Sequence, residues 1–171
     1  MKQVAVPTPT VTRSIWHGTP SLESANKRGA GVLNGRLGME LVELGDDYLV
    51  GRMPVDPRTH QPAGVLHGGA SVAFAETLAS WAGSFAVDRS RFHCVGMEIN
   101  ANHIRPASSG WVTGVARPVN IGRTTQVWDI RITGESGKLV CIARCTLAVL
   151  EMPSAYAVED LRLTPDGPPL R

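Results

Sequence analysis

The sequence has few cysteines and almost no net charge. Three cysteines among 171 residues are an odd number, which argues against a disulfide framework. The 17 lysines and arginines nearly balance the 15 acidic residues, giving a net charge of +2, and no block of like charge occurs. This balance disfavours nucleic acid as the main partner. Since 43% of the residues are hydrophobic, the chain can form one domain with a sizeable core.

Long apolar runs are also missing. No N-terminal stretch has the charged-then-apolar pattern of a signal peptide, and glycine, serine, threonine and Glu76 interrupt the longest uncharged run. We therefore expect a cytoplasmic protein without a membrane partner. The two ends, "MKQVAVPTPTVTR" and "TPDGPPLR", are rich in proline or threonine and lack a helical period. The sequence thus predicts one domain over residues 15–152, with a flexible N-terminal tail over 1–14 and a second tail over 153–171.

Two of the cysteines, Cys141 and Cys145, are spaced closely enough to suggest a metal pair. Their segment, "KLVCIARCTLAVLEM", is typical of a strand, however, and four residues of a strand span roughly 13 Å. We therefore predict that both are small core hydrophobes and that the protein has no metal site.

The predicted elements are a short helix, a hairpin, a long helix and four strands. Ser21, Glu23 and Ser24 form a capping signal for the short helix, and two β-rich runs flank a turn at 45–47. Residues 69–87 are small or apolar on nearly every side, which predicts a buried helix. The strand-like segments that follow are "HCVGMEINANHIRP", "GWVTGVARPVN", "TTQVWDIRITGE" and "KLVCIARCTLAVLEM".

A meander of strands can hide one long helix only if the sheet curls around it. The predicted fold is therefore α+β, a hotdog arrangement in which a long antiparallel sheet wraps around one central helix. A single curled sheet leaves open edges and a half-covered helix. We therefore expect two such subunits to pair.

One carboxylate, Glu76, lies inside the stretch from His60 to Asp88, which has no lysine or arginine. Burying an unpaired carboxylate is costly, so its position needs a reason. The "HGG" at 67–69 begins the helix, whose first N–H groups have no internal partner and carry the positive end of its dipole. Because glycine lacks Cβ, a carbonyl oxygen can approach them closely, as in an oxyanion hole. Glu76 lies about two turns further along and Ser80 one turn beyond it, on the same side of the helix.

Structural alternatives stay open for both features. The two glycines of "HGG" would also suit a simple tight turn, and Glu76 would also suit a buried ion pair with an arginine from a strand. The candidate partners for that ion pair are Arg105, Arg117 and Arg144. The combination of the carboxylate with "HGG" favours the catalytic interpretation.

Three motifs carry a resemblance to a known family: "MPVDPRTHQPAGVLHGGASVAFAETLASWAG", "VGMEINANHIRP" and "NIGRTTQVW". In this order and spacing the sequence resembles the hotdog-fold acyl-CoA thioesterases of the 1,4-dihydroxy-2-naphthoyl-CoA hydrolase type, which are PaaI-like thioesterases. Their close relatives include the proofreading thioesterase of enterobactin synthesis. The resemblance covers about residues 15–150. It implies hydrolysis of an acyl-CoA or acyl-carrier thioester, of which an aryl-CoA such as 1,4-dihydroxy-2-naphthoyl-CoA is the expected case, without a cofactor.

The resemblance also implies roles for single residues. Glu76 matches the catalytic carboxylate, which attacks the thioester carbon or activates a water. Gly68 matches the residue whose backbone N–H polarises the thioester oxygen, with His67 beside it. Gln61 matches a glutamine that helps to place the thioester or the water, from its own subunit or the neighbouring one. Ser80 matches a supporting hydroxyl position that varies among related families.

A second set of residues matches positions that bind the CoA part of the substrate. Arginine suits the phosphate oxygens of CoA, and the resemblance implies this use of Arg105 and Arg123, with His103 nearby. The other matching positions are Gly96, Asn120, Gly122 and Thr124. Asn120 departs from the family pattern, since histidine tends to stand at this position.

Two other functions remain as alternatives. One is a hydratase or dehydratase on the same fold, but the sequence lacks the "HxxxxGxxP" histidine loop of that group. The other is a non-catalytic acyl-CoA-binding module, which would not need Glu76. By resemblance, the expected assembly is a homodimer or a homotetramer built as a dimer of dimers.

Overall fold

The computed structural model describes residues 14–152. Apart from Ser14, the two predicted tails lie outside the described residues. The chain begins with α1 (Leu22–Gly29), α2 (Leu33–Arg36), β1 (Glu40–Leu44) and β2 (Leu49–Pro54). It continues with α3 (Gly68–Phe85), β3 (Phe92–His103), β4 (Trp111–Ile121), β5 (Thr125–Gly134) and β6 (Leu139–Glu151).

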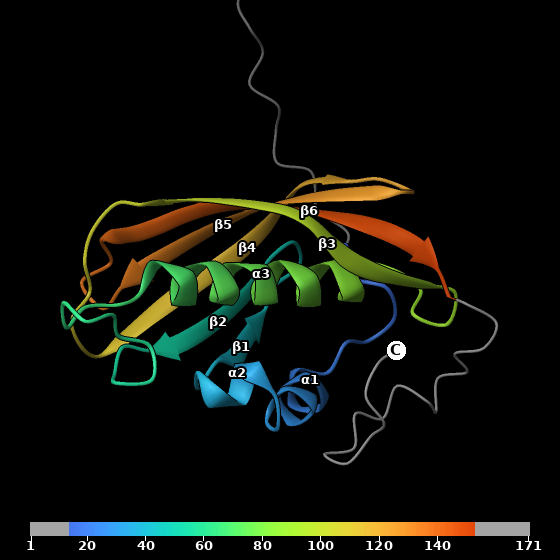
Figure 1. The fold of residues 1–171 in the computed structure, drawn as a ribbon. Coiled ribbons are helices and arrows are strands. Elements are labelled where there is room, and N and C mark those ends of the chain that lie inside the picture. Colours follow the sequence, from blue (N-terminus) through green and yellow to red (C-terminus); the bar gives the residue numbers. More distant parts are fainter. Residues whose placement is uncertain (1–13, 153–171) are drawn as a thin grey trace, which may run out of the picture.

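The strands form one antiparallel sheet in the order β1-β2-β4-β5-β6-β3. The sheet curves over α3, which lies along its concave side, and the two short helices lie at the β1 end (Figure 1). The predicted α+β hotdog fold is confirmed. The edge strands are β1 and β3, and β3 is the long one.

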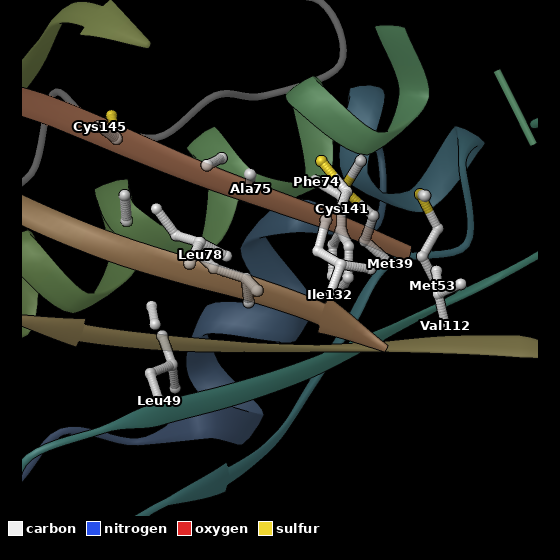
Figure 2. Close-up of a cluster of buried hydrophobic side chains, with 14 of the residues drawn as sticks. Met39, Leu49, Met53, Phe74, Ala75, Leu78, Val112, Ile132, Cys141 and Cys145 are labelled. Atoms are coloured by element: carbon white, nitrogen blue, oxygen red, sulfur yellow. The ribbon is translucent and has the colours of Figure 1, made fainter. Parts of the chain in front are cut away.

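The core fills the space between α3 and the sheet. Phe74 and Leu78 of α3 are fully buried and meet side chains from the sheet strands (Figure 2). Trp128, Ile130 and Ile132 are also fully buried, which confirms the period of two predicted for β5. Each buried side chain removes apolar surface from water, and together they hold the helix in the curl of the sheet.

The helix differs from the prediction in its bounds, since the sequence predicted 69–87 and α3 runs from Gly68 to Phe85. In one chain α3 is buried on one side only, as expected for a helix that a single curled sheet half-covers. Glu76, Ser80 and Trp81 remain half-exposed. A single curled sheet covers only the side of the helix that faces it, so the remaining side of α3 is open in one chain.

Cys141 and Cys145 are both fully buried and free, as predicted for core residues. They belong to β6, within the main apolar cluster. Among residues 14–152, no group of three or more histidine, cysteine or acidic side chains is placed to hold a metal ion. No helix in this described part is both long and apolar enough to cross a membrane.

Candidate active site

The start of α3 brings together residues from two distant parts of the sequence. His67 is the N-cap, and its Nδ1 accepts a hydrogen bond of 2.8 Å from the N–H of Gly69. Within residues 14–152 the N–H of Gly68 has no hydrogen-bond acceptor. A Cβ placed on Gly68 would lie 2.9 Å from Nε2 of His103, so this imidazole from the end of β3 packs against the helix start. The result is a helix N-terminus with a free donor and two histidines beside it.

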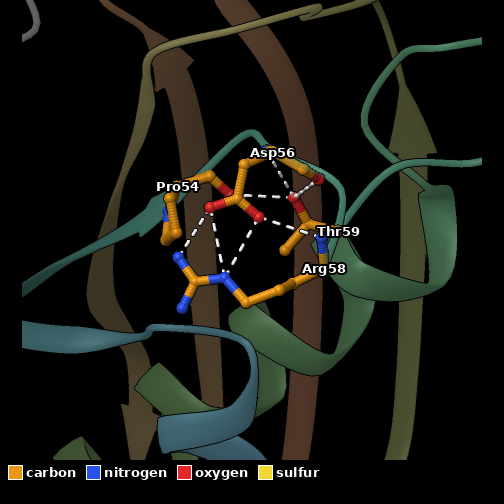
Figure 3. Close-up of polar contacts among 4 residues, drawn as sticks. All are labelled: Pro54, Asp56, Arg58 and Thr59. Carbon is orange, nitrogen blue, oxygen red and sulfur yellow. Dashed lines mark hydrogen bonds and ion pairs between the residues drawn. The ribbon is translucent and has the colours of Figure 1, made fainter.

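A polar network braces the loop that leads into α3 (Figure 3). Asp56 forms an ion pair with Arg58, 2.6 Å from Oδ2 to Nη2, and the hydrogen bonds from Arg58 hold the pKa of Asp56 below its ordinary value. The buried hydroxyl of Thr59 donates to the carbonyl of Pro54 at 2.9 Å. The backbone oxygen of Thr59 in turn accepts from the N–H of His67 at 2.8 Å. The network thus fixes where the helix begins.

Sequence analysis did not identify this network. The signal was present in "DPRT", where an aspartate and a threonine flank a proline and an arginine, since short polar side chains bond to nearby backbone in turns. Its role is to support the site, because none of its side chains lies at the helix start itself.

Gln61 sits in the same loop, in a tight turn closed by a 2.9 Å hydrogen bond from its N–H to the carbonyl of Val65. Its side-chain Nε2 donates a long bond of 3.4 Å to the carbonyl of Leu66, directly before the helix cap. Gln61 is half-buried. The structure therefore places this amide at the N-terminal end of α3, together with His67 and Gly68.

Glu76 lies in the middle of α3 and is half-buried. In the described part of the chain it makes no ion pair and no side-chain hydrogen bond. Arg117 pairs instead with Asp47 at 2.6 Å, and Arg105 donates to the carbonyl of Leu139 at 3.0 Å. The proposed ion pair with Arg105, Arg117 or Arg144 does not form, which removes the simplest structural reason for this acid.

The charge of Glu76 acts on a buried thiol of the neighbouring strand β6. Burial, together with the charges of Glu76 and Glu98, raises the pKa of Cys145 to about 12. The carboxylate itself lies over the backbone of β3, because a Cβ built on Gly96 would be 2.6 Å from its Oε1. Ser80, one turn along the helix, is half-buried and makes no side-chain hydrogen bond among the described residues. Glu76 therefore faces Gly96, a residue that the resemblance had assigned to the CoA part of the site.

The remaining residues with a predicted CoA role fall at two ends of the molecule. His103 of β3 lies at the start of α3. Cys94 of β3 lies near the end of α3, because a Cβ built on Gly83 would be 3.6 Å from its Sγ. The strand β3 thus runs antiparallel along the helix, and Arg105 follows it at the helix start.

The β4–β5 turn lies at the opposite end. Thr125 is paired with Ala148 of β6, and the same Ala148 is paired with Val95, next to Cys94. The turn contains Gly122, Arg123 and Thr124, and Asn120 lies just before it near the end of β4. All four residues are exposed or half-exposed. The 18 residues of α3 extend about 27 Å, so one chain does not bring Arg105 and Arg123 together.

Comparison with known proteins adds the following findings. The sequence model of the thioesterase superfamily matches residues 63–141. The chain is similar to the EntH proofreading thioesterase of Cronobacter turicensis, 48% identical over 80% of this chain and 98% of that protein. It is 46% identical to the 1,4-dihydroxy-2-naphthoyl-CoA hydrolase of Escherichia coli K12, over 80% of this chain and 99% of that protein.

A solved structure gives the same result for the fold. A thioesterase of Pseudomonas aeruginosa, crystallised as a glutamine-to-alanine variant, superposes with a TM-score of 0.80 at 50% identity. The match covers 81% of this chain and 100% of the crystallised one.

Proposed function

This chain belongs to the thioesterase superfamily and is a thioester hydrolase, and we propose that it hydrolyses an acyl-CoA with Glu76 as the catalytic carboxylate. The observation that carries the proposal is the setting of Glu76. It is a half-buried acid on the central helix, without a cation or hydrogen-bond partner among residues 14–152. A carboxylate that is not held in an ion pair or a hydrogen bond can attack a carbon or accept a proton.

Two chemical routes fit this carboxylate. In the first, it attacks the thioester carbon, forms a mixed anhydride and expels the CoA thiolate, and water then hydrolyses the anhydride. In the second, it removes a proton from a water that attacks the same carbon. Both routes build negative charge on the thioester oxygen, which the free N–H of Gly68 would stabilise.

Two solved structures of one relative support the assignment of Gln61 and Glu76. One Staphylococcus aureus thioesterase has been solved with alanine in place of a glutamate and, separately, in place of a glutamine. Those two residues are fifteen positions apart in that protein, as Gln61 and Glu76 are here. The match in residue types and spacing suggests that the same pair serves this chain.

The complete site would require two copies of the chain. Glu76 lies eight residues beyond Gly68, which corresponds to about 12 Å along the helix. Reacting atoms must come within about 3–3.5 Å of each other, so one thioester does not reach both groups in a single chain. Pairing of two chains with their α3 helices antiparallel would place Gly68 and Gln61 of one chain near Glu76 of the other. The open face of α3 and the unpaired edge of β3 support such pairing.

The acyl group is proposed to be aromatic. This part of the proposal relies on the similarity to the 1,4-dihydroxy-2-naphthoyl-CoA hydrolase and to the EntH proofreading thioesterase. The thiol carrier would be CoA. Its phosphates would bind Arg105 of one chain and Arg123 of the other, since these residues lie at opposite ends of a single chain.

A thiol-release assay tests the function. Wild-type protein should release CoA from aryl-CoA thioesters faster than from short- or long-chain acyl-CoAs, and Glu76→Gln should lower kcat by several orders of magnitude while remaining folded. Near-normal turnover by Glu76→Gln would contradict the role of Glu76. Binding without thiol release in the wild type would favour the acyl-CoA-binding module, and hydration of an enoyl-CoA would favour the hydratase.

A single turnover in ¹⁸O-labelled water separates the two routes. With enzyme in excess, an anhydride that water opens at the Glu76 carbonyl leaves the bridging Glu76 oxygen on the first product molecule, which then carries little label, while the label enters Glu76. A general base, like an anhydride opened at the acyl carbon, delivers labelled oxygen from the first turnover onward, so an unlabelled first product identifies the nucleophilic route.

Mixing two inactive variants tests the shared site. If Gln61 serves the Glu76 of the other chain, Gln61→Ala and Glu76→Ala proteins should recover activity when their subunits exchange, because one mixed site in each dimer is intact. A monomer at micromolar concentration by light scattering would contradict the assembly, and exchange without recovery would place both residues in one chain's site.

A further inference from the structure

Gly96 lies in the edge strand β3, directly beneath the carboxylate of Glu76. A Cβ built on Gly96 would be 2.6 Å from Oε1 and 3.7 Å from Cδ of Glu76. No other atom of the described structure, beyond its chain neighbours, lies within 4 Å of that Cβ position. Among the described residues of one chain, the carboxylate of Glu76 is therefore what a side chain at position 96 would meet.

The backbone of Gly96 does not require glycine. Five glycines of the described chain have positive φ, and Gly96 is not among them. In the interior of a strand, glycine loses conformational entropy and offers no side chain to pack. A glycine at such a position usually marks a close approach by another group, and here that group is Glu76.

Other strand glycines of this protein have a different surrounding. A Cβ on Gly114 would meet Leu78 at 2.5 Å and Phe74 at 2.9 Å, which are core side chains. By contrast, Gly96 is solvent-exposed on its strand. Packing of the core therefore explains Gly114 and leaves Gly96 unexplained.

The pairing of β3 with β6 is irregular at the same point. Gly96 is paired with Leu147 and Glu98 with Thr146, so Met97 is an extra residue in a β-bulge. Met97 is 64% exposed. Bulges bend a strand and redirect the residues next to them, and they are frequent beside active sites. The bulge therefore adjoins Gly96, the residue that meets the Glu76 carboxylate.

We propose that Gly96 is a positioning residue: its missing side chain lets the carboxylate of Glu76 rest on the β3 backbone, where it is aimed at the thioester carbon. This inference rests on the proposed role of Glu76. A methyl group at position 96 would push the carboxylate away from the strand. Because a methyl group at position 96 would meet only the carboxylate among the described residues, the packing of the rest of the chain would stay the same.

The first measurement is the Gly96→Ala variant. Its kcat should fall at least tenfold, with KM for an aryl-CoA within about threefold of the wild-type value. Its melting temperature should stay the same or rise, because alanine suits a strand better than glycine does. The matched control is Gly134→Ala, whose Cβ would make an ordinary 3.6 Å contact with Val140 and should leave kcat unchanged.

The second measurement is a cycle with Glu76→Asp. Aspartate is one methylene shorter, so its carboxylate would not reach a methyl group at position 96. In the Glu76→Asp background, Gly96→Ala should therefore lower kcat by less than threefold. An equal factor in both backgrounds would show that the two positions act independently, and it would overturn the inference.

Other outcomes separate this inference from the proposed function. If Glu76→Gln is inactive but Gly96→Ala has the wild-type kcat, only the inference is wrong. A raised KM with unchanged kcat in Gly96→Ala would overturn it in favour of the CoA role that the resemblance implies. If Glu76→Gln keeps its turnover, the proposed function itself fails.

Discussion

The two sides of α3 that meet the sheet both use glycine, but for different contacts. On the interior side, Phe74 and Leu78 press onto Gly51 of β2 and Gly114 of β4, and all four residues are buried. On the other side, Glu76 rests on Gly96 of the edge strand β3. A strand glycine allows a helix side chain to approach the backbone in each case.

The role of each strand glycine depends on whether the side chain that packs against it is apolar or charged. Where the side chain is apolar and the strand is internal, the contact fills the core and contributes to stability. Where the side chain is a carboxylate and the strand is an open edge, the contact buries little apolar surface. We infer that this second kind of contact serves the reaction, and the following predictions separate the two kinds.

The largest expected effect is on the interior side. Gly114→Ala places a Cβ 2.5 Å from Leu78 Cδ1 within an internal strand, where neither partner can move freely. Overpacking of this kind typically costs about 1–3 kcal/mol. Urea unfolding should show the loss of stability, while kcat per folded molecule stays near that of the wild type. Gly96→Ala should instead lower kcat and keep its stability. A fall in kcat without a loss of stability in Gly114→Ala would contradict the distinction between the two glycines.

The sequence predicted the interior side well. The period of two in "TTQVWDIRITGE" and the apolar run of α3 depend on local patterns of hydrophobicity, and both were confirmed. The sequence also predicted that one curled sheet leaves the helix half-covered, and in a single chain α3 is buried on one side. Glu76 and Ser80 interrupt the apolar pattern, and both are half-exposed.

The site was predictable only in part. Placing Gly68 and Glu76 on one helix needs only the helical repeat, and the structure agrees. The contacts of Gly68 with His103 and of Glu76 with Gly96 join residues distant in sequence, and they depend on how β3 is registered against α3. No local pattern encodes that register. The separation of Arg105 from the β4–β5 turn follows from the same topology and was not foreseen.

An intermediate effect is expected for the arginines assigned to CoA. Arg105→Ala and Arg123→Ala should each raise KM for CoA thioesters about tenfold, which corresponds to about 1.4 kcal/mol, the scale of one charge-assisted contact. KM for N-acetylcysteamine thioesters, which have no phosphate, should hardly change. Arg36→Ala, on α2, serves as a control for the loss of one positive charge. Equal losses on both substrate types would remove these arginines from the phosphate site.

The last expected effect is on stability and leaves activity at neutral pH untouched, and it concerns the interior beneath Glu76. Cys145 is fully buried there, and burial with the charges of Glu76 and Glu98 raises its pKa from 9.0 to about 12. Between pH 9 and pH 12 the unfolded chain loses this proton while the folded protein keeps it, so the thiol should destabilise the fold increasingly as pH rises. One proton limits the effect to about 1.4 kcal/mol for each pH unit. The free energy of unfolding in urea should therefore fall more steeply from pH 9 to pH 10.5 in the wild type than in Cys145→Ala. The constant offset caused by the smaller side chain cancels in this comparison of slopes, as do the shared contributions of Cys94 and Cys141. Parallel slopes would mean that the pKa of Cys145 is not raised by folding and that water reaches the thiol in the folded protein. Water would then also enter the space between the Glu76 carboxylate and β6.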